Sequence, residues 1–393
     1  MKPPLQPDES RGSHLPIFVF AKGAKMKKFL FLGVIVLSGS LMGSETRVNT
    51  MGAVPGFLID NSNVRLYPAL INDYPNEIIG EVKNPSISCL ISAGKFGVFG
   101  LGMNTDTVPT IVHRAIRKAN GWHFSTPSPE LVIYYGKRII PELSLGLKLG
   151  GANRYYEKNS WFQKIGTLKG MFSVKLEPLP ENSIELTGGV KRFGFESRTV
   201  YIDTANYKDQ GKYSFKGGVR TLSQVSPELL FIVGGNYEKI NVSWKKEEVI
   251  TSLEDLSSRN IEGYAGFNFT PTHNTTIILG ALVGEEKGDT ITVDTVFTNV
   301  NRVAPKIVVG VETEVADWLT VRVGGSKSFN NLELKKTSGD IEVDKKRTKE
   351  EVFSLAFGWS IKLRDFELDV MSNELPFVES SVGLSATYRF SSF

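Results

Sequence analysis

The chain has 393 residues, of which 41% are hydrophobic and 10% are aromatic, and Cys89 is its single cysteine. This composition excludes a disordered chain, because apolar and aromatic residues are plentiful. It also excludes a bundle of membrane-spanning helices, which needs several apolar runs of about 20 residues. One cysteine permits neither an internal disulfide nor a cysteine-based zinc site.

A targeting segment is predicted at the N-terminus. The long apolar run covers residues 29–42, directly after Lys27 and Lys28, and small residues follow it. A short basic stretch, an apolar stretch and small residues are typical of a secretory signal peptide. We therefore expect a signal peptide at residues 26–44. We also expect translation to begin at Met26, so that residues 1–25 are an extension from a start site assigned too far upstream. An uncleaved membrane anchor is the alternative.

The net charge of +4 belongs to this leader. Residues 1–44 contain six Lys and Arg residues but only two acidic residues, so the rest of the chain is neutral. The charge balance therefore gives no argument for nucleic-acid binding.

Alternation of apolar and polar residues dominates the chain from about residue 77 to its end. In residues 142–150, for example, leucines alternate with Ser144, Gly146 and Lys148. Similar alternation recurs at residues 307–315, 319–324, 353–362 and 382–390. A period of two predicts β-strands with one apolar and one polar face. We expect the leucines to face lipid and Ser144 to face a wet lumen.

The connections between these strands fall into two kinds. Short ones are rich in Pro, Asn and Asp, as at residues 178–182, 223–227 and 271–274, and predict tight hairpin turns. Long polar ones are expected at about residues 104–130, 152–166, 194–211, 244–258, 286–303, 331–350 and 372–380. Short turns at one rim and long loops at the other are typical of outer-membrane barrels.

The predicted fold is therefore all-β: a transmembrane, antiparallel, up-and-down β-barrel over residues 77–393. Closure is required because an open sheet edge in lipid leaves backbone groups unsatisfied. Seven long loops imply 14 strands. An extra pair at residues 78–82 and 86–93 would make 16, which is the alternative count. A soluble β-sandwich also alternates, but it does not explain a signal peptide together with strands of membrane-crossing length.

The polar faces carry charged residues that we expect to line the lumen. These candidates are Lys148, Lys175, Lys191, Arg220, Glu262, Glu312, Arg322, Lys362 and Arg389. Because the two signs are mixed, strong ion selectivity is not expected.

Residues at the C-terminus carry a family resemblance. Leu384, Ala386, Tyr388 and Phe390 occupy alternate positions, and Phe393 follows after two serines. This pattern resembles the terminal β-signal of bacterial outer-membrane proteins. The resemblance implies that the barrel-assembly machinery is a partner and that the protein lies in the bacterial outer membrane, in contact with its lipid.

Residues 45–76 lack sustained alternation. Gly52 and Gly56 precede a polar stretch of Asp60, Asn61 and Asn63, and Tyr67 and Pro68 follow. This order resembles the N-terminal segment of the long-chain fatty acid transporter (FadL-like) family, although Tyr67 replaces the family's usual Asn. The resemblance implies a plug-like hatch inside the barrel. A short periplasmic tail is the alternative. A short helix is expected at residues 69–73 at most.

Motifs for catalysis are not found: the sequence has no phosphate-binding glycine loop, no HExxH and no Gly-x-Ser-x-Gly. We predict no enzyme activity, no cofactor and no metal site. The expected function is a pore or transporter-like barrel for small or amphipathic solutes. A non-transporting barrel that is a scaffold for a surface or secretion complex is the alternative. The oligomeric state is left open.

Overall fold

A computed structural model describes residues 45–52, 56–82, 85–104, 129–158, 161–179, 181–199, 207–246, 253–291, 296–338, 341–372 and 382–391. All of them belong to one compact unit, Ser40–Phe393. The expected extension, the signal peptide and Phe393 lie outside the described residues.

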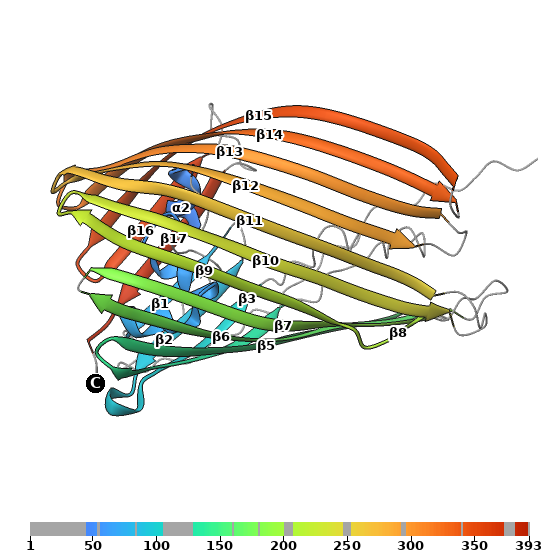
Figure 1. Ribbon diagram of the computed structural model, residues 1–393. Coiled ribbons are helices and arrows are strands. Elements are labelled where there is room, and N and C mark those ends of the chain that lie inside the picture. The colour runs from blue at the N-terminus through green and yellow to red at the C-terminus, as the bar shows by residue number, and fades with distance from the viewer. Residues whose placement is uncertain are drawn as a thin grey trace, which may run out of the picture. The chain divides into compact units, whose positions relative to one another are not determined.

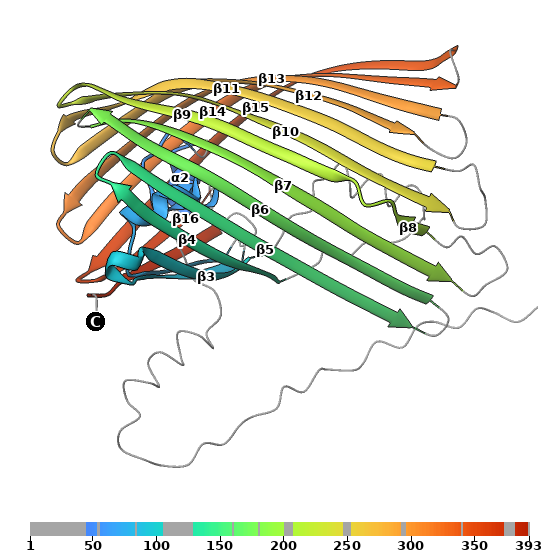
Figure 2. The ribbon, with the colours of Figure 1, turned by 60° about the horizontal axis from the view of Figure 1, so that its bottom comes forward.

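The described chain forms a closed antiparallel barrel of 16 strands plus one short extra strand (Figures 1 and 2). The strands are β1 Glu77–Glu81, β2 Ser86–Ser92, β3 Val98–Asn104, β4 Glu130–Ile140, β5 Leu143–Lys158, β6 Trp161–Leu179, β7 Asn182–Thr199, β8 Tyr207–Asp209, β9 Tyr213–Ser226, β10 Leu229–Lys246, β11 Leu253–Thr272, β12 Thr275–Ile291, β13 Val296–Ala316, β14 Leu319–Ser338, β15 Ile341–Leu363, β16 Phe366–Ser372 and β17 Val382–Arg389.

Pairing between β1 and β17 closes the barrel. Glu77 lies opposite Arg389 in this register, and Arg389 Nε donates to Glu77 Oε1 at 2.8 Å. The short strand β8 pairs with β7 and β10, the same two neighbours that β9 has. β8 therefore lies between β7 and β10 in the part of the sheet that β9 does not reach. The pairing of β1 with β17 joins the two edges of the sheet, as a barrel that lies in lipid requires.

The favoured count of 14 strands is wrong, and the alternative of 16 is confirmed. Residues 77–104 contain three strands, β1, β2 and β3. β1 and β2 are short, and only a few residues separate them. Counting long loops therefore missed this hairpin.

Four of the expected long loops are also wrong. The chain continues as paired strands through most of residues 152–166, 244–258, 286–303 and 331–350, so that β5–β6, β10–β11, β12–β13 and β14–β15 form long hairpins. These parts are rich in charged and amide side chains, and apolar residues such as Leu332 and Leu334 alternate there only over short runs, so the strand pattern is weak in sequence. Their backbones nevertheless pair across the hairpin, as in Glu333 opposite Arg347.

The two faces of the wall differ sharply in composition. Outward side chains are mostly apolar and exposed, such as Leu147 and Leu149 on β5, whereas Ser144 and Lys148 on the opposite face are buried. The same alternation holds on β14, where Val321 and Val323 are exposed and Thr320 and Arg322 are buried. The outer face therefore suits contact with hydrocarbon. Ser144 faces inward as expected but is only 1% exposed, so it does not line a wet lumen.

Candidate functional site

Part of the chain before β1 lies inside the barrel. We call residues 45–52 and 56–76 the lumen segment. It contains the helix α2 (Glu45–Thr50) and two 3-10 helices, η1 (Asn61–Arg65) and η2 (Pro68–Asp73). Both views show α2 within the ring of strands (Figures 1 and 2), and α2 contacts β14 to β17 whereas η2 contacts β4 to β6.

Local sequence explains the shape of the lumen segment. Asp60 caps η1, because its carboxylate accepts the N–H of Ser62 at 2.7 Å, and Asn63 Nδ2 donates to the carbonyl of Leu58 at 2.5 Å. Pro68 begins η2, where its fixed φ and missing N–H cost nothing. The segment is therefore held in compact turns, and η2 covers the short helix that the sequence predicts.

Two apolar clusters join the lumen segment to the wall. In the first, Met51, Phe57 and Leu58 pack against inward side chains such as Ile232 and Tyr264. In the second, Tyr67, Leu70 and Ile71 pack against others, including Leu90 and Tyr134. Met51, Phe57 and Ile71 are each 0% exposed. Burial of this apolar surface stabilises the segment in its place.

Several inward-facing glycines of the wall lie directly against the lumen segment, and we call them the glycine footprint. A Cβ atom on Gly146 would lie 2.1 Å from the backbone nitrogen of Ala69, and one on Gly324 would lie 2.1 Å from the carbonyl carbon of Met51. A Cβ atom on Gly136, Gly280 or Gly310 would also lie within 2.5 Å of an atom of the segment. A strand interior normally disfavours glycine, except where another backbone must come close. The wall is therefore shaped to receive this segment.

Arg220 on β9 forms hydrogen bonds with the backbone of the lumen segment. Its guanidinium is 0% exposed, pairs with Glu185 on β7, and donates to the carbonyls of Gly56 and Leu58 at 3.2 and 3.4 Å. The same guanidinium lies 5.0 Å from the centre of the Tyr67 ring. Burial raises the pKa of the Tyr67 phenol, so it stays neutral.

A second buried charge cluster holds α2. Arg47 donates to both Glu312 oxygens, at 2.8 and 2.6 Å, and its Nη1 lies 3.7 Å from Asp60 Oδ2. Glu312 also pairs with Arg322, which contacts Asp369 at 2.5 Å. Burial opposes the charge on Arg47, but the nearby Glu312 carboxylate raises the Arg47 pKa above its ordinary value. The cluster therefore stays charged and ties the helix to β13, β14 and β16.

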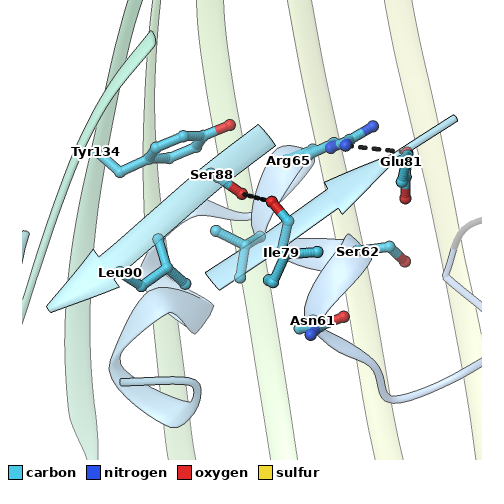
Figure 3. A pocket seen from close by; sticks show the side chains of 9 residues that line it. Asn61, Ser62, Arg65, Ile79, Glu81, Ser88, Leu90 and Tyr134 are labelled. Atoms are coloured by element: carbon cyan, nitrogen blue, oxygen red, sulfur yellow. Dashed lines mark hydrogen bonds and ion pairs between the residues drawn. The ribbon is translucent and has the colours of Figure 1, made fainter. Parts of the chain in front are cut away.

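The opposite end of the lumen segment is tied by three further ion pairs. Asp73 accepts from Lys175 at 2.8 Å and from Arg138 at 2.9 Å. Figure 3 shows Arg65 pointing to Glu81 on β1, and the Nη2–Oε2 distance is 3.0 Å. A cavity of 20 Å³ lies beside this pair, which is room for about one water molecule. The lumen segment and the wall therefore meet here with almost no space between them; we call this contact the seam.

A larger cavity opens on the other side of Arg65. Its volume is 430 Å³, its floor is Arg65 and Leu66, and its walls come from β5, β6, β7, β9 and β10. Four lysines line it: Lys148, Lys169, Lys191 and Lys216.

The structure places the other candidate residues as follows. Lys362 and Glu314 form an ion pair at 2.6 Å, and Glu262 accepts from Asn236 at 3.4 Å. Asn61 in the lumen segment donates to Glu77 at 3.0 Å. In the C-terminal pattern, Leu384, Ala386 and Tyr388 alternate along β17. Phe390 follows the strand; its N–H donates to the carbonyl of Asn76 at 3.0 Å, and its ring stacks on Tyr388.

Sequence reasoning missed Arg47, Tyr264, Glu130 and the glycine footprint. The footprint had a detectable signal, because Gly266, Gly280, Gly310, Gly324 and Gly358 all occupy inward positions at similar distances from the short turns. The partners of Arg47 had none, since Glu312 lies 265 residues away in sequence.

The residues that the structure describes contain neither a membrane-crossing helix nor a metal-binding group of side chains. No helix there has both the length and the apolar character needed to cross a membrane. In the same residues, no group of three or more His, Cys, Asp or Glu side chains could hold a metal ion.

Comparisons with known proteins give structural similarities only. No family model matches the sequence, and no curated protein matches it. Among solved structures, the alcaligin outer-membrane receptor FauA of Bordetella pertussis is 7% identical, with a TM-score of 0.49 over 80% of this chain and 65% of FauA. This chain therefore spans about two thirds of the length of FauA.

Two hydrocarbon transport proteins are also similar in structure. The toluene transporter TodX of Pseudomonas putida is 9% identical, with a TM-score of 0.44 over 89% of this chain and 98% of TodX. The monoaromatic hydrocarbon channel CymD is 10% identical, with a TM-score of 0.43 over 90% and 98% of the two chains. Similarities at this level carry no argument about solute or mechanism. The chain's own geometry defines a closed 16-stranded barrel of the outer-membrane type.

Proposed function

We propose that this protein is a transporter-like barrel of the bacterial outer membrane, that its lumen segment is a hatch, and that it has no catalytic chemistry. Small or amphipathic solutes would pass when the hatch shifts. The observation that carries this proposal is the fit between segment and wall, in which backbone of the segment rests on glycines such as Gly146 and Gly324.

The chemistry of the seam supports a hatch that can move. Its ion pairs join Arg47, Arg65 and Asp73 of the segment to side chains of the wall. Such pairs depend on charge, so a competing charge that approaches them can weaken them, whereas a uniformly apolar contact has no comparable trigger. A periplasmic tail would not require the wall to carry a matching footprint.

A reversible crosslink tests whether the hatch must move. Ser173 Oγ accepts the N–H of Ala69 at 2.5 Å, so cysteines at these two positions lie close enough to join. The double variant A69C/S173C is made in a C89S background, reconstituted in liposomes, and compared with each single cysteine variant. Swelling assays with sugars and release assays with amphipathic dyes then measure solute flux.

We expect oxidation to suppress flux in the double variant only, and a reductant to restore it. Flux that is equal in the oxidised and reduced double variant would contradict the hatch. Absence of flux in every folded variant would instead favour the scaffold alternative.

A further inference from the structure

The lysine-lined cavity above the lumen segment is built by strand register. Lys169 on β6 lies directly opposite Lys191 on β7. Lys191 in turn lies opposite Ser214 on β9, and Lys216 is two residues further along β9. Like charges directly opposite each other destabilise a sheet. An arrangement that costs stability indicates that the positive charge has a role in binding.

Acidic residues balance this charge only in part. Lys169 Nζ lies 2.5 Å from Glu130 Oε2, and Glu238 lies opposite Lys216 in the register. Among the residues that the structure describes as lining the cavity, five are basic and Glu238 alone is acidic. When Glu130, which pairs with Lys169, is also counted, the basic residues still outnumber the acidic ones.

Two of the lysines contact an aromatic ring of the wall. Lys148 donates to the backbone carbonyl of Arg65 at 3.2 Å and lies 5.4 Å from the centre of the Tyr134 ring. Lys191 lies 4.5 Å from the centre of the Phe193 ring. Carbonyls and aromatic faces both attract an ammonium group. These contacts hold the two side chains at the wall of the cavity.

The rest of the lumen shows the opposite pattern. Arg220 pairs with Glu185, and Arg322 pairs with both Glu312 and Asp369. Lys175 pairs with both Asp73 and Glu177. The sequence-based count of mixed charges predicts weak ion selectivity, but pairing uses most of the acidic residues elsewhere. Basic residues therefore predominate in the lining of this cavity.

We propose that the cavity is a binding site for a small oxyanion, in which the lysines bind a phosphate or carboxylate group of a solute. Lysine ammonium groups bind such groups as point charges, and low-dielectric walls strengthen the attraction. The volume of 430 Å³ lies within the range of small-molecule sites. The assignment of this anion as a transported solute rests on the proposed function, whereas binding itself does not.

Calorimetric titration of the full-length, detergent-solubilised protein tests the site. Inorganic phosphate and succinate are the two probes, and they distinguish a phosphate site from a carboxylate site. The test variant is K191Q/K216Q. The matched control is K306Q, because Lys306 is also inward-facing but lies on β13, outside the cavity. Circular dichroism and resistance to SDS confirm that each variant is folded.

We expect at least one probe to bind, and K191Q/K216Q to weaken that binding by about tenfold or more. K306Q should leave the affinity unchanged, and added salt should weaken binding to the native chain. The inference is overturned if neither probe binds at about 10 mM, or if K306Q weakens binding as much as the double variant. Binding that persists in a protein without solute flux would overturn the proposed function alone.

Discussion

Glu185 and Arg220 lie directly opposite each other on β7 and β9 and form an ion pair at 2.5 Å with side chains only 1% and 0% exposed. The pair is part of the wall, but its remaining hydrogen bonds go to the carbonyls of Gly56 and Leu58. Glu185 therefore orients Arg220, and Arg220 holds the backbone of the lumen segment.

Replacing Arg220 should be costly. Arg220→Met leaves Glu185 buried without its partner and two carbonyls without donors, and we expect a loss of about 3–5 kcal/mol in unfolding free energy. Urea titration of the barrel in lipid vesicles measures it. The double variant with Glu185→Gln should lose less than the sum of the single variants. Strict additivity would mean that the two residues are not coupled.

Adding a side chain to the glycine footprint should displace the lumen segment. In Gly146→Val, the new Cβ would lie 2.1 Å from Ala69 N, whereas a Cβ on Gly188 has no neighbour within 4 Å. We expect trypsin to cut faster at Arg47 and Arg65 in Gly146→Val than in the native protein. Gly188→Val is the control and should leave cleavage unchanged. Equal cleavage of both variants would show that the glycines do not position the segment.

Removing the charge of Arg47 should loosen α2 without opening the barrel. Arg47→Met loses two hydrogen bonds to Glu312, but Glu312 keeps Arg322 as a partner. Hydrogen bonds to charged groups contribute about 1.5–3 kcal/mol each, and we expect a loss at the lower end because the acid stays paired. Hydrogen exchange of residues 45–52 measures this change. Unchanged protection would mean that apolar packing alone holds the helix.

The outer face predicts a depth-dependent cost for charge. Leu147 is exposed four residues beyond the start of β5, whereas Val315 is exposed next to the short turn after β13. We expect Leu147→Arg to cost about 2–4 kcal/mol and Val315→Arg about 0–1 kcal/mol, because arginine is most costly near the bilayer centre. Urea titration in vesicles compares them. The reverse order would place the membrane at a different height on the barrel.

Alternation predicted strands with two different faces, because inward and outward positions differ in chemistry along most strands. The leader pattern and the length of the strands then favoured a barrel over a sandwich. Alternation did not give the strand count, since β1 and β2 are short and closely connected. It also failed at the outer hairpins such as β14–β15, where charged residues are frequent and the alternation of Leu332 with Leu334 and of Ile341 with Val343 covers only short runs. Backbone pairing there does not depend on a long apolar face.

The candidate site was predictable only in outline. Short polar residues and Pro68 correctly predict compact turns around a short helix, because these effects are local. The burial of Ser144 was not predictable, because it depends on which other segment of the folded chain packs over it. The ion pairs of Arg47 and Arg220 join residues distant in sequence, and no local pattern identifies such partners.

The conductance of a chain that lacks most of the lumen segment tests the central proposal most directly. Deletion of residues 50–75 removes η1 and η2 but leaves the wall strands and the closing pair of β1 and β17 intact. Single-channel recordings in planar bilayers compare this variant with the native chain, after both are shown to resist SDS as folded barrels. We predict a clear rise in conductance on deletion. An unchanged conductance would contradict the proposal that this segment closes the lumen.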